Sequence, residues 1–241
     1  FRSVVWAFNG SCCITLVGCL RAKDGTITTV SGLEGWHNTQ LRSIDAKGTA
    51  VGVYEDAGGI QRAFVRSPEG ILTQFAPLAN VLTVDITSSG NGTIAGSYYD
   101  PDSDQYLGFL QNADGSLTTF GDPEHTGDFF HVAVNDNGWI TGWYQISRQP
   151  GFIRRPSGKF TILKRGVSNS INSSEAVSGF QSKSAFVRSK NGEIMEVHMP
   201  VDKSFVEWTV LNDSRVLAGT FCEKDVCRFQ EDDGFVAYPL Q

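Results

Sequence analysis

The stretch Ser43-Ile44-Asp45-Ala46-Lys47-Gly48-Thr49-Ala50-Val51-Gly52-Val53-Tyr54 sets the pattern that the rest of the chain follows. It begins with an apolar run, continues through a turn that ends in glycine, and closes with a run of the form small-Val-Gly-x-Tyr. A third run, Arg62-Ala63-Phe64-Val65-Arg66, leads to a second turn that ends at Gly70. Short runs rich in β-branched and aromatic residues between turn residues are typical of strands. Glycine suits such turns because it adopts positive φ without a steric cost.

The same order of signals returns along the chain at intervals of 34 to 45 residues, marked by the glycines of the second turn. These anchors are Gly25, Gly70, Gly115, Gly158, Gly192 and Gly234. An alternating run follows each anchor, so each repeat is expected to hold four short strands, here numbered first to fourth. Four strands repeated every ~40–50 residues are the signature of a β-propeller.

We therefore predict an all-β, six-bladed β-propeller with four-stranded antiparallel blades, as a single domain over residues 1–241. A five-bladed ring is the alternative because the first repeat is short. Only 15 residues separate Gly10 from Gly25, against 22 between Gly48 and Gly70.

The amino-acid composition limits the classes of partner that we expect. The chain has 241 residues, 40% hydrophobic content, a net charge of −6 and no cluster of Lys or Arg, so we expect no nucleic-acid partner. No apolar run approaches the ~18 residues that span a bilayer, so we expect no membrane span. The oligomeric state is left open.

Cysteines and glycosylation sequons favour a secretory or extracellular protein. Cys222 and Cys227 flank a plausible hairpin tip and could form a disulfide, and Cys12 or Cys13 could pair with Cys19. The chain begins at Phe1 without an initiator Met, so we expect either a trimmed chain or a leader that was removed. Asn-x-Ser/Thr sequons, expected to be glycosylated, lie at Asn9, Asn91, Asn172 and Asn212.

The repeated runs Ala63-Phe64-Val65-Arg66, Gly151-Phe152-Ile153-Arg154 and Ala185-Phe186-Val187-Arg188 resemble the HAF-type extracellular repeats, although no copy carries the His. The resemblance covers nearly the whole chain and implies a propeller. In its length, single domain, sequons and missing catalytic motif the chain is also similar to the fungal hetero-Diels-Alderases. That resemblance implies a biosynthetic enzyme of secondary metabolism that joins a tropolone-derived quinone methide to a terpene alkene without a cofactor.

Familiar catalytic motifs are missing. The sequence has no Gly-x-Ser-x-Gly elbow, no P-loop and no dinucleotide fingerprint. The acidic loop Asp100-Pro101-Asp102-Ser103-Asp104 lacks a bidentate Glu at a fixed offset, so we expect no metal site. We accordingly predict small apolar or aromatic substrates and a reaction that relies on orientation within a water-poor pocket.

All the sequons lie in or beside first-to-second turns, so the opposite face of the propeller is expected to stay free of glycans and to carry the site. We expect aromatic and histidine side chains on that face to bind the substrate: Trp36, Tyr54, Tyr98, His125, Phe129, Phe130, Trp143, Tyr144 and Trp208. Because Tyr54 has a counterpart in the other repeats, a packing role between blades also fits it.

His37, Arg42 and His131 are the catalytic candidates, because a hydrogen-bond donor can polarise a carbonyl or assist the loss of water. His131, at the start of a strand, also fits a histidine whose role is structural. Two alternatives stay open. A lectin-like glycan- or protein-binding propeller predicts shallow polar pockets between blades, whereas the enzyme predicts one apolar funnel. A glycosidase needs two carboxylates ~5–10 Å apart, drawn from Asp85, Glu124, Asp128 or Glu207.

Overall fold

The computed structural model describes residues 5–6, 18–21, 24–78, 80–121, 129–144, 150–163, 166–181, 183–199, 204–223 and 233–238. Its contacts divide the chain into two compact units, residues 1–132 and 133–241. Every sheet in the described part is antiparallel, and its strands follow one another in sequence order. None of the described helices is long and apolar enough to cross a membrane.

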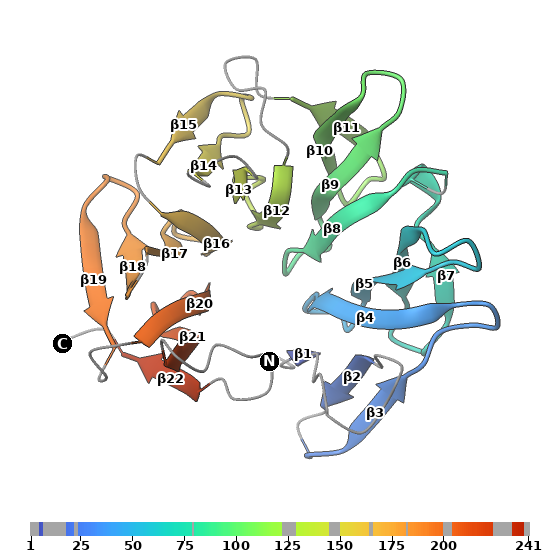
Figure 1. The fold of residues 1–241 in the computed structure, drawn as a ribbon, viewed down its shortest axis with the longest axis horizontal. Coiled ribbons are helices and arrows are strands. Elements are labelled where there is room, and N and C mark those ends of the chain that lie inside the picture. The colour runs from blue at the N-terminus through green and yellow to red at the C-terminus, as the bar shows by residue number, and fades with distance from the viewer. Residues whose placement is uncertain are drawn as a thin grey trace. The chain divides into compact units, whose positions relative to one another are not determined.

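Unit 1 holds three sheets (Figure 1). The first comprises β1 (Val5–Trp6), β2 (Gly18–Arg21) and β3 (Ile27–Val30). The second comprises β4 (His37–Ile44), β5 (Ala50–Glu55), β6 (Gln61–Arg66) and β7 (Leu72–Gln74), and a 3-10 turn, η1 (Ala76–Leu78), follows it. The third comprises β8 (Thr83–Ser88), β9 (Ile94–Asp100), β10 (Gln105–Gln111) and β11 (Leu117–Phe120).

Unit 2 continues the pattern. A four-stranded sheet comprises β12 (Phe129–Val134), which begins before the boundary, β13 (Ile140–Tyr144), β14 (Gly151–Arg154) and β15 (Phe160–Ile162). The next comprises β16 (Val167–Ile171), β17 (Val177–Gln181), β18 (Ser184–Arg188) and β19 (Ile194–His198). A three-stranded sheet of β20 (Ser204–Leu211), β21 (Leu217–Glu223) and β22 (Asp233–Ala237) follows.

The predicted four-stranded antiparallel repeat is confirmed in four sheets. The predicted count of six such blades is wrong. Gly234 was interpreted as a turn anchor, yet it lies inside β22 and pairs with Thr220 of β21. β22 thus takes the place of a third strand, and Phe235 stands opposite Gly219 as Phe64 stands opposite Gly52.

Five of the predicted anchors do occupy third-to-fourth turns, with φ between 86° and 98°. They are Gly25, Gly70, Gly115, Gly158 and Gly192. The described residues therefore contain five outer hairpins of the predicted kind, not six, and the sheets β1–β3 and β20–β22 have three strands each.

The glycine of the second strand is required by close packing. A Cβ on Gly52 would lie 2.1 Å from the carbonyl oxygen of Gln40 on β4 and 2.7 Å from the ring of Phe64 on β6. A Cβ on Gly96 would lie at the same distances from the carbonyl oxygen of Asp85 and from the ring of Phe109. The glycine thus lets the Phe of the third strand lie flat against the second strand, and Phe64 and Phe109 are fully buried as a result.

In several described sheets an Asp or Asn caps the first-to-second turn. Asp45 Oδ1 accepts the backbone N–H groups of Lys47 and Thr49, both at 2.8 Å. Asn172 Oδ1 accepts those of Ser174 and Ala176 at 3.0 and 2.9 Å. This Asx-turn arrangement satisfies two turn donors with one oxygen atom.

In unit 2 the same asparagines also connect successive turns. Asn135 Nδ2 donates to the carbonyl of Asn172 at 2.9 Å, and Asn172 Nδ2 donates to the carbonyl of Asn212 at 3.1 Å. We call this series the asparagine ladder. In the ladder, one asparagine side chain both caps its own turn and binds the next turn.

Replacing Asn172 by Asp is expected to lower the free energy of unfolding by about 1–3 kcal/mol, because the Oδ1 cap is kept but a carboxylate oxygen faces the Asn212 carbonyl. Urea denaturation measures the loss. Asn212→Asp is the matched control: Asn212 Oδ1 caps its turn through Val216, and its Nδ2 donates to no residue that the structure describes. Equal losses in the two variants would contradict a linking role for the Asn172 amide.

Candidate active site

Three polar side chains from first strands come together in unit 1. Asp85 on β8 is only 8% exposed, and its Oδ2 lies 2.7 Å from Nδ1 of His131 on β12. The same oxygen accepts the backbone N–H of Val132 at 3.2 Å. Arg42 on β4 is exposed, and its charge acts on the Asp85 carboxylate. We call Arg42, Asp85 and His131 the acid–base cluster.

Bulges in the first strands set where these side chains point. On β4 the register shifts between Leu41 and Ser43, so Arg42 is the extra residue. On β8 it shifts between Thr83 and Asp85. A bulge turns a side chain away from the strict alternation of a strand and is common beside active sites. β4 and β8 lie side by side in Figure 1.

The surroundings of Asp85 favour its ionised form. Burial raises the pKa of this carboxyl, but the charge and hydrogen bond of His131, the charge of Arg42 and the N–H of Val132 outweigh burial and lower the pKa below its usual value. Asp85 therefore acts as a fixed negative charge that orients the His131 ring. Such a pair can hold a proton for transfer, and the exposed Arg42 can stabilise a negatively charged oxygen.

The lowered pKa predicts how acid affects stability. A carboxyl whose folded pKa is depressed contributes stability above its unfolded pKa of about 3.9, and that contribution is lost as pH falls through the folded pKa. At pH 7 we expect Asp85→Asn to be less stable than the wild type by about 1–3 kcal/mol, and this difference should shrink below about pH 4. Thermal unfolding at pH 7 and pH 2.5 measures both. Asp102→Asn, at an exposed turn residue, is the control, and a difference that grew at low pH would contradict the assignment.

Of the predicted catalytic residues, His131 contacts Asp85, and Arg42 acts on Asp85 through its charge. His37, the third, is exposed at the start of β4 and pairs with Glu55. At ~3.3 Å per residue it lies about 16 Å along the strand from Arg42, away from the cluster. Asp85 was considered only for a glycosidase. Its signal was a carboxylate between Val84 and Ile86 in a strand otherwise built for burial, which requires a partner.

Most of the aromatic candidates pack inside the sheets. Trp36 stacks on Tyr54, with ring centroids 3.6 Å apart, and Tyr98 is 8% exposed near Phe109. Phe129 and Tyr144 are buried, against Phe120 at 5.6 Å and Phe152 at 4.9 Å respectively. Trp143 is half-buried, and Trp208 is 40% exposed. His125 and the side chain of Phe130 lie outside the described residues.

The predicted glycosylation sites differ in access. Asn91 is exposed, and Asn212 is half-buried. Asn172 is 3% exposed and its Nδ2 belongs to the ladder, so in the folded chain this nitrogen is not available to a glycan. Asn9 lies outside the described residues, as does Cys227, the predicted partner of the buried Cys222. Glycosylation at the other sites and the disulfide stay predictions.

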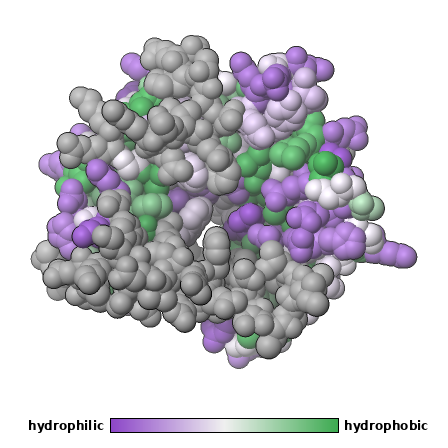
Figure 2. All heavy atoms as spheres, viewed as in Figure 1, coloured by the Kyte–Doolittle hydropathy of each residue, from purple (hydrophilic) through white to green (hydrophobic). Residues whose placement is uncertain are grey.

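A cavity of about 700 Å³ lies in unit 2, between β15 and the strands β17 to β19 of the next sheet. None of its lining residues was among the predicted site residues. Figure 2 shows hydrophobic residues over β8 and β9 and hydrophilic residues over β4 in unit 1. No group of His, Cys, Asp or Glu suited to a metal ion occurs in the part of the chain that the structure describes.

Comparison with known proteins establishes the fold. No protein-family model matches the chain, and no curated protein matches its sequence. Among solved structures, a catalytically inactive variant of virginiamycin B lyase from Staphylococcus aureus with quinupristin matches all of this chain and 89% of its own, at 13% identity and a TM-score of 0.62. The β-propeller domain of the Trilobed protease from Pyrococcus furiosus matches 98% of this chain and 77% of its own, at 12% identity and a TM-score of 0.58.

The fold is a β-propeller. A gluconolactonase from Xanthomonas campestris also matches, over 92% of this chain and 79% of its own, at 13% identity and a TM-score of 0.58. At such identities the likeness concerns the fold alone.

Proposed function

We propose that this β-propeller is an enzyme in which His131 transfers a proton to a small apolar or aromatic substrate. The observation that carries the proposal is the 2.7 Å contact between His131 and the buried Asp85, with the charge of Arg42 acting on the same carboxylate. Two of the matched propellers are a lyase and a gluconolactonase by their descriptions, which supports catalysis as a use of this fold.

The reaction we assign is a hetero-Diels-Alder cycloaddition between a tropolone-derived quinone methide and a terpene alkene. His131 holds its Nδ1 toward Asp85, so its Nε2 is the atom that exchanges a proton with the substrate. The imidazolium donates that proton to the hydroxyl of a hydroxymethyl tropolone, the C–O bond breaks and water leaves. The proton of the tropolone O–H then returns to His131, which leaves a neutral quinone methide.

In this proposal Arg42 stabilises the tropolone oxygen as its proton departs. The cycloaddition that follows forms two bonds and needs no further proton. Orientation of the two reactants alone can lower such a barrier by ~7–11 kcal/mol. The cluster therefore prepares the reactive partner, and the protein surface around it aligns the alkene.

The test is to incubate the protein with a hydroxymethyl tropolone and a humulene-type alcohol, and to follow adduct formation by chromatography. We expect a faster reaction and one dominant stereoisomer relative to the same mixture without protein. A rate and isomer ratio equal to those of the protein-free mixture would refute the proposal. The binding-module alternative depends on a different part of the molecule, the cavity in unit 2.

A further inference from the structure

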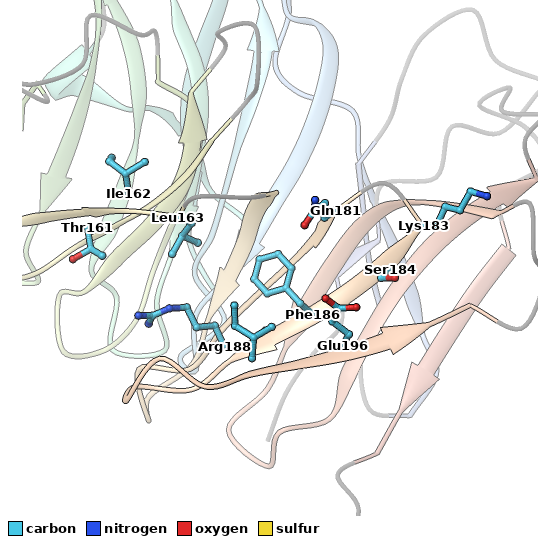
Figure 3. A pocket seen from close by; sticks show the side chains of 10 residues that line it. Thr161, Ile162, Leu163, Gln181, Lys183, Ser184, Phe186, Arg188 and Glu196 are labelled. Atoms are coloured by element: carbon cyan, nitrogen blue, oxygen red, sulfur yellow. The ribbon is translucent and has the colours of Figure 1, made fainter.

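The cavity in unit 2 has the size of a small-molecule binding site. Its volume of about 700 Å³ falls within the ~300–1,000 Å³ typical of small-molecule pockets. Figure 3 shows Leu163, just after β15, on one side and Phe186 and Ser184 of β18 on the other. Both sheets belong to unit 2, and Leu163 and Phe186 share one buried cluster, which gives the cavity a rigid floor.

At the cavity, the position after the fourth strand carries an aliphatic side chain, whereas the second sheet has an aromatic ring there. In unit 1 the fourth strand of the second sheet is followed by Phe75, which packs on Phe109 of the next sheet with centroids 5.6 Å apart. The equivalent residue of the first sheet is the small Val30, but Trp36 lies 5.5 Å from Phe64 and fills that space. In unit 2 the equivalent residue is Leu163, opposite Phe186. The Leu163 side chain takes up less volume than the Phe75 ring does in unit 1.

Two polar residues at the cavity occupy positions that vary from sheet to sheet. Ser184 stands where the second and third sheets have Arg62 and Leu107. Glu196, opposite Phe186, stands where those sheets have Gln74 and Thr119. By contrast, Phe186 and Arg188 keep the repeat. Positions that repeat in every sheet mostly serve the packing that the sheets share, so a specific binding site is expected at positions that vary.

The lining carries charges of both signs. Figure 3 shows Arg188 reaching toward β15 below Leu163, and Glu196 beside Phe186 and Ser184. Arg188 donates one N–H to the Ser189 carbonyl at 3.3 Å, which fixes the guanidinium at the edge of the cavity. Ser184 Oγ lies 2.9 Å from His198 Nδ1. Lys183 also lines the cavity, and Glu196 is exposed and lies 3.8 Å from His198 Nε2. A cationic ligand would therefore meet Arg188 and Lys183, and an anionic one would meet Glu196.

We propose that this cavity binds a short neutral oligosaccharide. Sugar hydroxyls both donate and accept, so they can pair with Arg188 and with Glu196 without bringing a like charge to either. The C–H face of a sugar ring can lie on the apolar floor of Leu163 and Phe186. This site is separate from the acid–base cluster and does not depend on the proposed reaction.

Isothermal titration with cellotriose, maltotriose and N-acetylated chitotriose tests the proposal, with trigalacturonate as the anionic comparison. We expect at least one neutral trisaccharide to bind. Arg188→Gln and Glu196→Gln should each weaken that binding about tenfold. Arg66→Gln is the matched control, because Arg66 makes the same turn contact, to the Ser67 carbonyl at 3.2 Å, in unit 1 and away from the cavity. Its binding should equal that of the wild type.

Leu163→Phe supplies an independent test, since it restores the ring that Phe75 provides elsewhere and should abolish binding in a chain that still unfolds cooperatively. The double variant Arg188→Gln/Glu196→Gln serves the same purpose if Leu163→Phe does not fold. Binding of none of the neutral probes, binding of trigalacturonate alone, or binding unchanged in these variants would overturn the proposal. Loss of binding in Arg66→Gln would do so as well.

Discussion

His131→Gln lowers the rate of adduct formation by about 10²–10⁴-fold, the usual contribution of a positioned acid or base, if His131 transfers the proton. Glutamine has a similar length and can still donate a hydrogen bond to Asp85, so the pairing with the carboxylate is kept. It cannot take up and release a proton at neutral pH. The rate under saturating tropolone, measured at one pH for both proteins, gives the factor.

A variant of Asp85, the partner of His131, tests the same role from the side of the carboxylate. Asp85→Asn is expected to slow the reaction too, because a neutral amide no longer balances an imidazolium 2.7 Å away. Asp102→Asn, at an exposed turn, should retain the wild-type rate. If His131→Gln reacts as fast as the wild type while all variants stay folded, then His131 has only a structural role, and the reaction, if present, depends on shape alone.

Gly52→Ala is expected to destabilise unit 1 by at least about 3 kcal/mol, because the added carbon has no place to go. Its Cβ would lie 2.1 Å from the Gln40 carbonyl oxygen and under 3 Å from two atoms of the Phe64 ring. The carbonyl belongs to a hydrogen-bonded neighbouring strand, and the ring is fully buried, so neither can move without breaking other contacts. Chemical denaturation of both proteins measures the difference.

Gly121→Ala is the matched control in the same unit. Its Cβ would approach only Leu107 Cδ2, at 3.5 Å, an ordinary contact. We expect a change within about 0.5 kcal/mol. A comparable loss in the two variants would mean that chain flexibility, rather than the clash with strand and ring, explains the need for glycine at position 52.

The repeat made much of the fold predictable. Turn glycines and alternating runs define strands by local chemistry, and their recurrence implies stacked four-stranded sheets, which the structure confirms in four cases. The last repeat was misread because Gly234 resembles a turn anchor in sequence, whereas β22 pairs directly with β21. Which strand pairs with which depends on long-range packing, and a single glycine does not encode it.

The site was predictable in part for a similar reason. Arg42 and His131 could be singled out as polar residues of expected first strands. That both act on Asp85 depends on bulges in β4 and β8, which no local pattern in the sequence predicts. The aromatic candidates Tyr54 and Tyr98 proved to be packed within the sheets. The cavity beside Leu163 lies at a position where the second sheet has the Phe75 ring. The two positions can be recognised as equivalent only in the three-dimensional structure.

The asparagine ladder has a direction, and that direction matters during synthesis. Asn135 donates to Asn172, and Asn172 donates to Asn212, so every donor leaves the ribosome before its acceptor. Each turn can cap itself at once but completes its last hydrogen bond only when the following repeat has emerged. When a nascent chain pauses between repeats, the last of these amides bonds to water, and the carbonyl of the next turn replaces that water once the turn has emerged.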